Sequence, residues 1–259
     1  MTDALTIEDL GRVRRLTLSA PRRRNALSFA LCAQLVGALR AAEADAAVGA
    51  VILTGNGPAF SAGGDQNDFR KATAEAPPKV LKNYPALDLF RIARNFHKPL
   101  IAAVNGAALG GGMGLVCLSH LALAVPEASF GIPEVRLGLF PATVLPVVRP
   151  LLGERLTYDL ALTGRTMSAQ EALEARIINR IVAPERLQDE ALELASRIAS
   201  FSPLAVGLGL ESLQVSADMP FEDAIQYLNA IRTVYFASED IREGGAAFLE
   251  KRPPVWRGR

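Results

Sequence analysis

Short apolar runs alternate with stretches of helical periodicity over much of the chain. Strands are predicted at residues 12–19, 51–54, 100–104 and 121–125, with Gly, Pro or Asn close to their ends. One helix is predicted after Ser28, with an apolar face of Leu31, Leu35, Leu39 and Ala42, and another from Pro85, with Leu89, Ile92, Ala93 and Phe96. This alternation predicts a mostly parallel sheet covered by helices, an α/β fold.

The pattern changes after about residue 153, where helical periodicity dominates. Apolar stripes fall at Leu187, Ala191, Leu194 and Ile198, and again at Phe221, Ala224, Ile225 and Leu228. One further strand is predicted at residues 178–182. We therefore expect an α/β core over residues 1–200 and a helical region over 201–259. Residues 70–84 are polar and contain Pro77-Pro78, so a mobile segment is predicted there.

Composition excludes several classes of protein. The 259 residues are 50% apolar and carry a net charge of +1, which favours neither nucleic acid nor a membrane surface. No apolar run approaches the roughly 20 residues of a membrane span, and no leader is evident, so we expect a cytoplasmic protein. Two histidines, His97 and His120, and two cysteines, Cys32 and Cys117, are too few for a typical zinc site. We expect these four residues to be structural, and no metal is predicted.

The run Gly110-Gly111-Gly112 lies between a predicted strand and an apolar helical stretch. Glycines let backbone N–H groups approach a ligand closely, and a helix N-terminus favours negative charge. A phosphate loop requires Lys and Ser or Thr after the glycines, but Met113 and Gly114 follow here. A dinucleotide fingerprint fails as well, because Leu115 stands at the last glycine. The anion is therefore better interpreted as an oxyanion, with close helix packing as the structural alternative.

A second loop is predicted at residues 60–65; it contains Gly63-Gly64-Asp65 and also follows a buried strand. Two loops beside the ends of parallel strands can direct one N–H each at the same oxygen. Asp65 is predicted to cap the turn that follows. The two loops together predict an oxyanion hole, although an ordinary turn would explain the second loop taken alone.

Five motifs, in order along the chain, resemble the crotonase (enoyl-CoA hydratase/isomerase) family. They are Asn25-Ala26-Leu27, residues 60–65, residues 98–106 with the glycines that follow, residues 130–138, and residues 248–252. The resemblance implies a spiral of ββα units, a C-terminal helical trimerisation region, and trimers or dimers of trimers. It also implies an acyl thioester of coenzyme A as substrate, with no separate cofactor.

The resemblance assigns roles to individual residues. The amides of Gly64 and Gly111 are expected to hold the oxygen of an enolate. Residues 66–90 are expected to shape the acyl pocket, and Lys251 of a neighbouring subunit to reach the nucleotide end. Contact with coenzyme A is expected at Arg24, from the basic run 22–24, and at Ala26, Ala62, Gly64, Asp65, Gln66, Asn67, Gly111 and Gly114.

Hydratases of this family use two glutamates twenty positions apart. Glu134 stands at the second position, in an apolar context that favours a raised pKa, and is the expected acid/base. Gly114 stands at the first position, so one carboxylate is missing. Hydration therefore competes with Δ3-Δ2 double-bond isomerisation, which one base can perform. A non-catalytic acyl-CoA-binding relative and a nucleotide-binding protein are the further alternatives.

Overall fold

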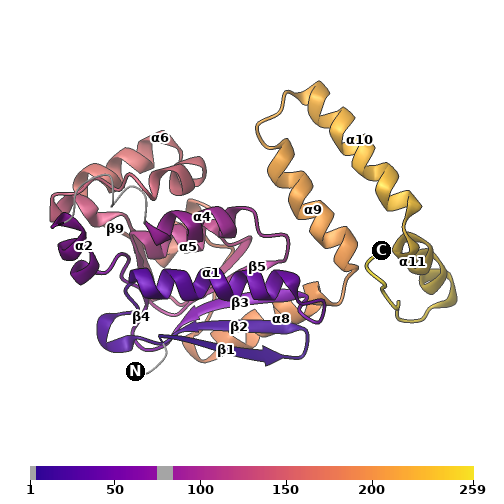
Figure 1. The fold of residues 1–259 in the computed structure, drawn as a ribbon, viewed down its shortest axis with the longest axis horizontal. Coiled ribbons are helices and arrows are strands. Elements are labelled where there is room, and N and C mark those ends of the chain that lie inside the picture. Colours follow the sequence, from indigo (N-terminus) through magenta and orange to yellow (C-terminus); the bar gives the residue numbers. More distant parts are fainter. Residues whose placement is uncertain (1–3, 75–83) are drawn as a thin grey trace.

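The computed structural model describes residues 4–74 and 84–259, which form two sheets surrounded by helices (Figure 1). The larger sheet has the spatial order β1-β2-β3-β5-β7-β10. Its strands are β1 (Leu5–Leu10), β2 (Val13–Leu18), β3 (Ala50–Gly55), β5 (Leu100–Val104), β7 (Leu121–Ala124) and β10 (Arg180–Ile181). β1 is antiparallel to β2, and every other neighbouring pair is parallel, as the sequence predicts.

The smaller sheet has the order β4-β6-β8-β9. Its strands are β4 (Ala59–Ser61), β6 (Ala107–Leu109), β8 (Ser129–Gly131) and β9 (Thr166–Ser168). β3, β5 and β7 of the large sheet are each followed directly by a strand of the small sheet and then by helical structure. This repeated order is the expected spiral of ββα units.

The helices of the core cover these sheets. They are η1 (Pro21–Arg23), α1 (Phe29–Ala44), α2 (Gln66–Thr73), α4 (Pro85–Arg94), α5 (Gly111–Leu118), η2 (Pro133–Leu137), α6 (Leu145–Thr163), α7 (Ala169–Glu174), η3 (Pro184–Arg186) and α8 (Leu187–Ala199). α1 packs against α4, and α8 packs across β2, β3 and β5. As predicted, the Ser28 side chain caps α1 by accepting from Leu31 N at 3.2 Å, and Leu31, Leu35, Leu39 and Ala42 are buried.

Several short strands differ from the sequence prediction. Residues 60–65 are predicted as a loop, but Phe60 and Ser61 form the end of β4. β6, β8 and β9 are also missed, because three residues are too few for a periodic pattern. β1 is missed because it is an edge strand with Leu5 as its one buried residue. Of the segment predicted to be mobile, residues 75–83 lie outside the described residues.

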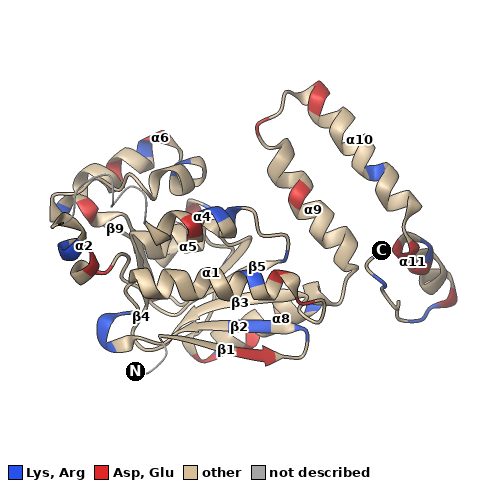
Figure 2. Cartoon of the chain, viewed as in Figure 1, with Lys and Arg blue, Asp and Glu red and all other residues tan. Residues whose placement is uncertain are grey.

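The C-terminal helices project away from the core (Figure 1). They are α9 (Pro203–Ser216), α10 (Phe221–Ala237) and α11 (Glu239–Glu250). α9 and α10 carry few charges along their length (Figure 2). The predicted α10 stripe is not buried in the single chain, since the side chains of Phe221, Ile225 and Leu228 are exposed. These helices therefore leave apolar surface uncovered. The boundary at residue 200 stays a prediction.

Over residues 4–74 and 84–259, no single helix is long and apolar enough to cross a membrane. One bent pair of segments, Pro184–Ala199 and Pro203–Ser216, passes by length and composition alone, with an angle of 102° between them. Its first helix, α8, packs on the large sheet.

Candidate active site

A cavity of about 580 Å³ opens beside both glycine loops. Gly64, Gly111 and Glu134 all line it, although Gly64 and Glu134 are 70 residues apart along the chain. The rest of the wall is largely apolar: Leu27, Phe29, Phe69, Ala72, Thr73, Tyr84, Ala86, Phe90, Leu139, Phe140, Pro141, Ala142, Thr143 and Val144. An apolar cavity with a few convergent polar groups is typical of a small-molecule site.

The two glycine loops meet because β4 and β6 are parallel neighbours and each loop follows one of them. Gly63 has a φ of +83°, and a Cβ on it would lie 2.6 Å from Leu109 O and 3.3 Å from Gly111 N. Only glycine fits such a close approach without displacing the neighbouring loop. Gly63 thereby brings the Gly64 loop against the start of α5.

The amides of Gly64 and Gly111 are available to a ligand. Gly111 is the first residue of α5, where an N–H has no partner inside the helix. Within the described part of the chain, neither N–H donates to a backbone oxygen outside regular helices and strands. The positive end of the α5 dipole adds to the attraction for negative charge at this point. The pair can therefore stabilise an oxyanion.

Hydrogen bonds on both sides fix the Gly64 loop. Leu27 N donates to Gly63 O at 2.7 Å, and Asp65 N donates to Leu27 O at 3.4 Å. The Asp65 side chain is buried, accepts from Asn67 N at 2.8 Å to cap α2, and forms an ion pair with Arg23. The predicted capping role of Asp65 is confirmed. Its carboxylate holds the loop, so contact with coenzyme A there would involve the backbone.

Asn25 connects the basic turn to the strands that carry the site. Its fully buried side chain accepts from Ala20 N at 2.9 Å and donates to Asn56 O at 3.0 Å and Ala59 O at 2.7 Å. Arg24 is exposed, and its carbonyl accepts from Ala62 N at 2.9 Å. This hydrogen bond therefore holds Arg24 next to Ala62, directly before Gly63 and Gly64 in the chain.

Glu134 lies in η2, where Pro133 begins the turn. Its Oε2 atom is buried and has no hydrogen-bond partner among the described residues. Burial raises the pKa of Glu134 above the ordinary value, while its own backbone N–H opposes the shift. A carboxyl group with a raised pKa beside an oxyanion hole is suited to proton transfer near neutral pH.

An aromatic ring covers Gly114. A Cβ on Gly114 would lie 3.0 Å from Phe90 Cζ and 3.4 Å from Val144 Cγ1, and Phe90 is buried. The same ring tip would be 3.9 Å from a Cβ on Gly111, one helical turn earlier. Phe90 therefore occupies the side of α5 on which a carboxylate at position 114 would project.

The cavity contains only some of the residues predicted for the site. Those predicted for coenzyme A that do not line it are Arg24, Ala26, Ala62, Asp65, Gln66, Asn67 and Gly114, and Lys251 lies at the end of α11. Their roles stay predictions. Of the segment 66–90, Phe69, Ala72, Thr73, Tyr84, Ala86 and Phe90 line the cavity. Tyr84 and Thr143 are polar wall residues that no motif singled out.

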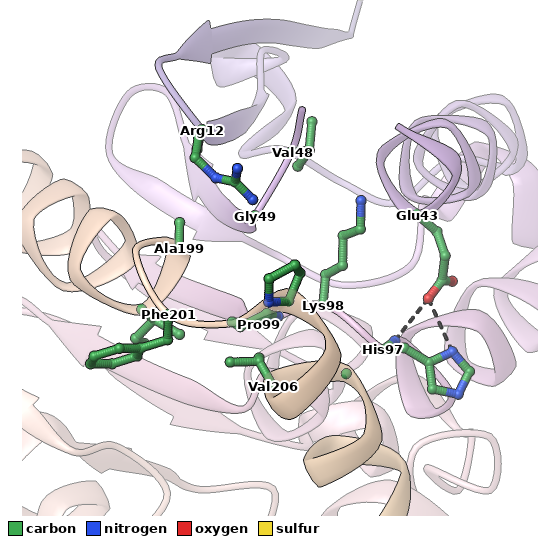
Figure 3. Close-up of a pocket in the computed structure, with 13 residues that line it drawn as sticks. Arg12, Glu43, Val48, Gly49, His97, Lys98, Pro99, Ala199, Phe201 and Val206 are labelled. Carbon is green, nitrogen blue, oxygen red and sulfur yellow. Dashed lines mark hydrogen bonds and ion pairs between the residues drawn. The ribbon is translucent and has the colours of Figure 1, made fainter. Parts of the chain in front are cut away.

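A second cavity of about 300 Å³ lies elsewhere, between α1, residues 97–99 just before β5, and the start of α9 (Figure 3). Two of its polar side chains have structural partners: Glu43 Oε1 accepts from His97 N at 2.9 Å, and Lys98 donates to the carbonyls of Ala42 and Asp45. Lys98 thus caps the end of α1. This cavity shares no residue with the glycine-loop cavity.

The remaining histidine and cysteines also have structural surroundings. His120 Nδ1 accepts from Leu100 N at 2.9 Å, and burial lowers its pKa to about 4. Burial raises the pKa of Cys32 to about 12, so its thiol is not ionised near neutral pH. Among the described residues, no cluster of three His, Cys, Asp or Glu side chains is placed to hold a metal.

Comparison with known proteins places this chain in a family. The enoyl-CoA hydratase/isomerase family model matches residues 9–259. A probable enoyl-CoA hydratase of Rhizobium meliloti is 37% identical, with 99% of each chain covered. The 2,3-dehydroadipyl-CoA hydratase of Escherichia coli is 36% identical, with 96% of each covered. The crystal structure of an enoyl-CoA hydratase from Mycobacterium smegmatis superposes with a TM-score of 0.92 at 30% identity, with 98% of each covered.

The chain therefore belongs to the enoyl-CoA hydratase/isomerase family, and it is an enzyme of the crotonase fold. Similarity extends over nearly the whole length, so the family assignment includes the C-terminal helices as well as the core.

Proposed function

We propose that the protein acts on an enoyl thioester of coenzyme A through an enolate held by Gly64 N–H and Gly111 N–H, with Glu134 as the acid/base. The convergence of these three residues on one cavity supports the proposal. Preorganised amides stabilise a developing oxyanion without reorganising, and removing one such donor in comparable sites costs about 2.7–4 kcal/mol.

Hydration is the reaction proposed first. Glu134 takes a proton from water while the water oxygen bonds to Cβ and the double-bond electrons move onto the thioester oxygen. Glu134 then returns that proton to Cα, and the enolate collapses to the 3-hydroxyacyl thioester. The hydratase names of the relatives support this choice, and one carboxylate is enough because the same proton is taken and returned.

Δ3-Δ2 isomerisation is the second candidate, and the apolar contact of Phe90 with Gly114 favours it. In this reaction Glu134 removes a proton from Cα and returns it to Cγ, with no water involved. A non-catalytic acyl-CoA-binding protein would bind the same thioesters without converting them.

The binding of the coenzyme A moiety is proposed at the outer side of the Gly64 loop. Arg24 and Ala62, both exposed, lie together there, and Gln66 and Asn67 at the start of α2 follow a few residues later. Ala26, Asp65 and Gly114 complete the proposed set, and a neighbouring subunit's copy of Lys251 would reach the nucleotide end.

A homotrimer, or a dimer of trimers, is proposed as the assembly. Phe221, Phe248 and Leu249 are at least 72% exposed, which is unusual for such large apolar side chains. Burial in a subunit interface would remove this surface from water. We also propose a cytoplasmic location, supported by the two cysteines, which are free thiols.

The test is a panel of enoyl-CoA isomers incubated with enzyme in heavy-oxygen water and analysed by mass spectrometry. Incorporated label identifies hydration, and a shifted double bond without label identifies isomerisation. Glu134→Gln should abolish either conversion while the thioester still binds. Full activity of that variant would exclude Glu134 as the acid/base.

A further inference from the structure

Two titratable side chains line the glycine-loop cavity within the described residues, Glu134 and Tyr84. The mechanism above uses Glu134 alone. Tyr84 precedes α4 directly, on a different segment from either glycine loop. Its phenol is therefore a polar group of the cavity wall that the mechanism above leaves without a role.

The Tyr84 ring is held in place. It meets the Phe29 ring edge-on, with centroids 5.7 Å apart and an interplanar angle of 85°. This arrangement is a favourable geometry for two aromatic rings. Phe29 is the first residue of α1, whose cap and buried face are fixed by the core. The contact with Phe29 thus holds the Tyr84 ring at the cavity wall.

Tyr84 and Glu134 line the same cavity, and the surroundings of Tyr84 keep its phenol protonated. Burial is the main cause that raises the pKa of Tyr84, Cys32 and then Glu134 add smaller contributions in the same direction, and Thr143 opposes the shift. The phenol is therefore neutral near neutral pH and available as a hydrogen-bond donor.

The position of the missing glutamate, Gly114, offers no such group. Phe90 and Val144 cover Gly114 with carbon atoms. A side-chain hydroxyl to hold a water molecule near Glu134 must therefore come from another part of the wall, which includes Thr73, Tyr84 and Thr143. Of these three, Tyr84 is the one whose pKa responds to Glu134. Glu134 Oε2, buried without a protein partner among the described residues, is free to accept from that water.

We propose that Tyr84 is a second catalytic residue, whose hydroxyl and the Glu134 carboxylate together hold the water that adds to Cβ. This inference rests on the proposed hydration at the same site. Tyr84 orients the water and keeps its own proton, while Glu134 alone takes and returns the transferred proton. The phenol supplies a contact that a second carboxylate would otherwise make.

The test compares Tyr84→Phe with wild type in two assays on the full chain. The first measures hydration of an enoyl-CoA thioester in heavy-oxygen water. The second measures exchange of the Cα hydrogen of a saturated acyl-CoA in deuterium oxide, which needs Glu134 and both glycine amides but no added water. Tyr158→Phe is the matched control, because Tyr158 is 55% exposed and outside the cavity.

Tyr84→Phe should lower kcat for hydration at least about tenfold, the scale of one oriented catalytic contact, with KM within about twofold and exchange unchanged. Hydration within about twofold of wild type would overturn the role of Tyr84, and so would an equal loss of exchange, which indicates a structural effect. Exchange by wild type without any hydration would overturn it too, and leave the enolate intact. Full exchange in Glu134→Gln would instead refute the proposed function.

Discussion

Glu134 Oε1 lies where a side chain on Gly110 would begin. A Cβ built on Gly110 would be 2.7 Å from this oxygen, and Gly110 has a φ of +51°. The glycine before the oxyanion donor therefore does more than shape the loop, because its missing side chain leaves room for the acid/base.

Gly110→Ala should consequently displace the Glu134 carboxylate. We expect kcat to fall about a hundredfold, since misplacing a reacting group by about 1 Å has this scale of effect. Stability should also fall by about 1–3 kcal/mol from backbone strain. Gly153→Ala is the control, because Gly153 has a φ of +68° and its added Cβ meets nothing within 4 Å. If both variants lose kcat equally, strain rather than displacement of Glu134 is responsible.

Two neighbouring arginines should separate binding from positioning. Arg23→Ala removes the cationic partner of the buried Asp65 carboxylate and should loosen the Gly64 loop. Because Arg23 is 53% exposed, we expect a loss of about 1 kcal/mol in stability and a reduced kcat. Arg24→Ala should instead raise KM for acyl-CoA, with a smaller effect at high salt. Thermal unfolding and kinetics at two ionic strengths distinguish the two. An unchanged KM for Arg24→Ala would contradict the proposed contact with coenzyme A.

Phe90 and Gly114 should be energetically coupled. Gly114→Glu overpacks the Phe90 ring and should cost about 1–3 kcal/mol, while Phe90→Ala should cost about 3–5 kcal/mol. The double variant has space for the glutamate, so its loss should be smaller than the sum of the two. A double-mutant cycle in denaturant measures this coupling. Additive losses would show that the ring does not occupy the space a glutamate needs.

The central strands and both glycine loops could be predicted from sequence, because apolar runs of four or five residues followed by glycine have a local signature. Val51 to Thr54 and Leu100 to Val104 are examples, and both lie in the large sheet. The small sheet could not be predicted, because its strands have three residues each and are stabilised by neighbours distant in sequence.

The candidate site likewise contains residues that the sequence identifies and residues that only the packing reveals. Gly64, Gly111 and Glu134 could be found because they belong to recognisable motifs, and the structure brings them to one cavity. The sequence shows that Gly114 lacks a carboxylate but not that Phe90 covers it, since that contact joins α4 to α5 through packing alone. Tyr84 has no local signal, because its position depends on the Phe29 ring 55 residues earlier.

The buried carboxyl group of Glu134 should lower the free energy of unfolding at neutral pH. Burial raises its pKa in the folded protein, so the folded state binds this proton more tightly than the unfolded chain does. Stability therefore decreases as pH rises from the ordinary glutamate value of 4.5 through the raised value, and remains lower above it. Glu134→Gln removes the charge and should stabilise the protein at pH 7 by roughly 1 kcal/mol, the scale of one unpartnered buried polar atom. The gain should disappear at acid pH, where wild-type Glu134 is protonated in both states.

Denaturant unfolding of both proteins across pH measures this difference, with Glu127→Gln as the control for a glutamate whose side chain is exposed. A gain that does not depend on pH would show that the stabilisation arises from packing rather than from the charge of Glu134.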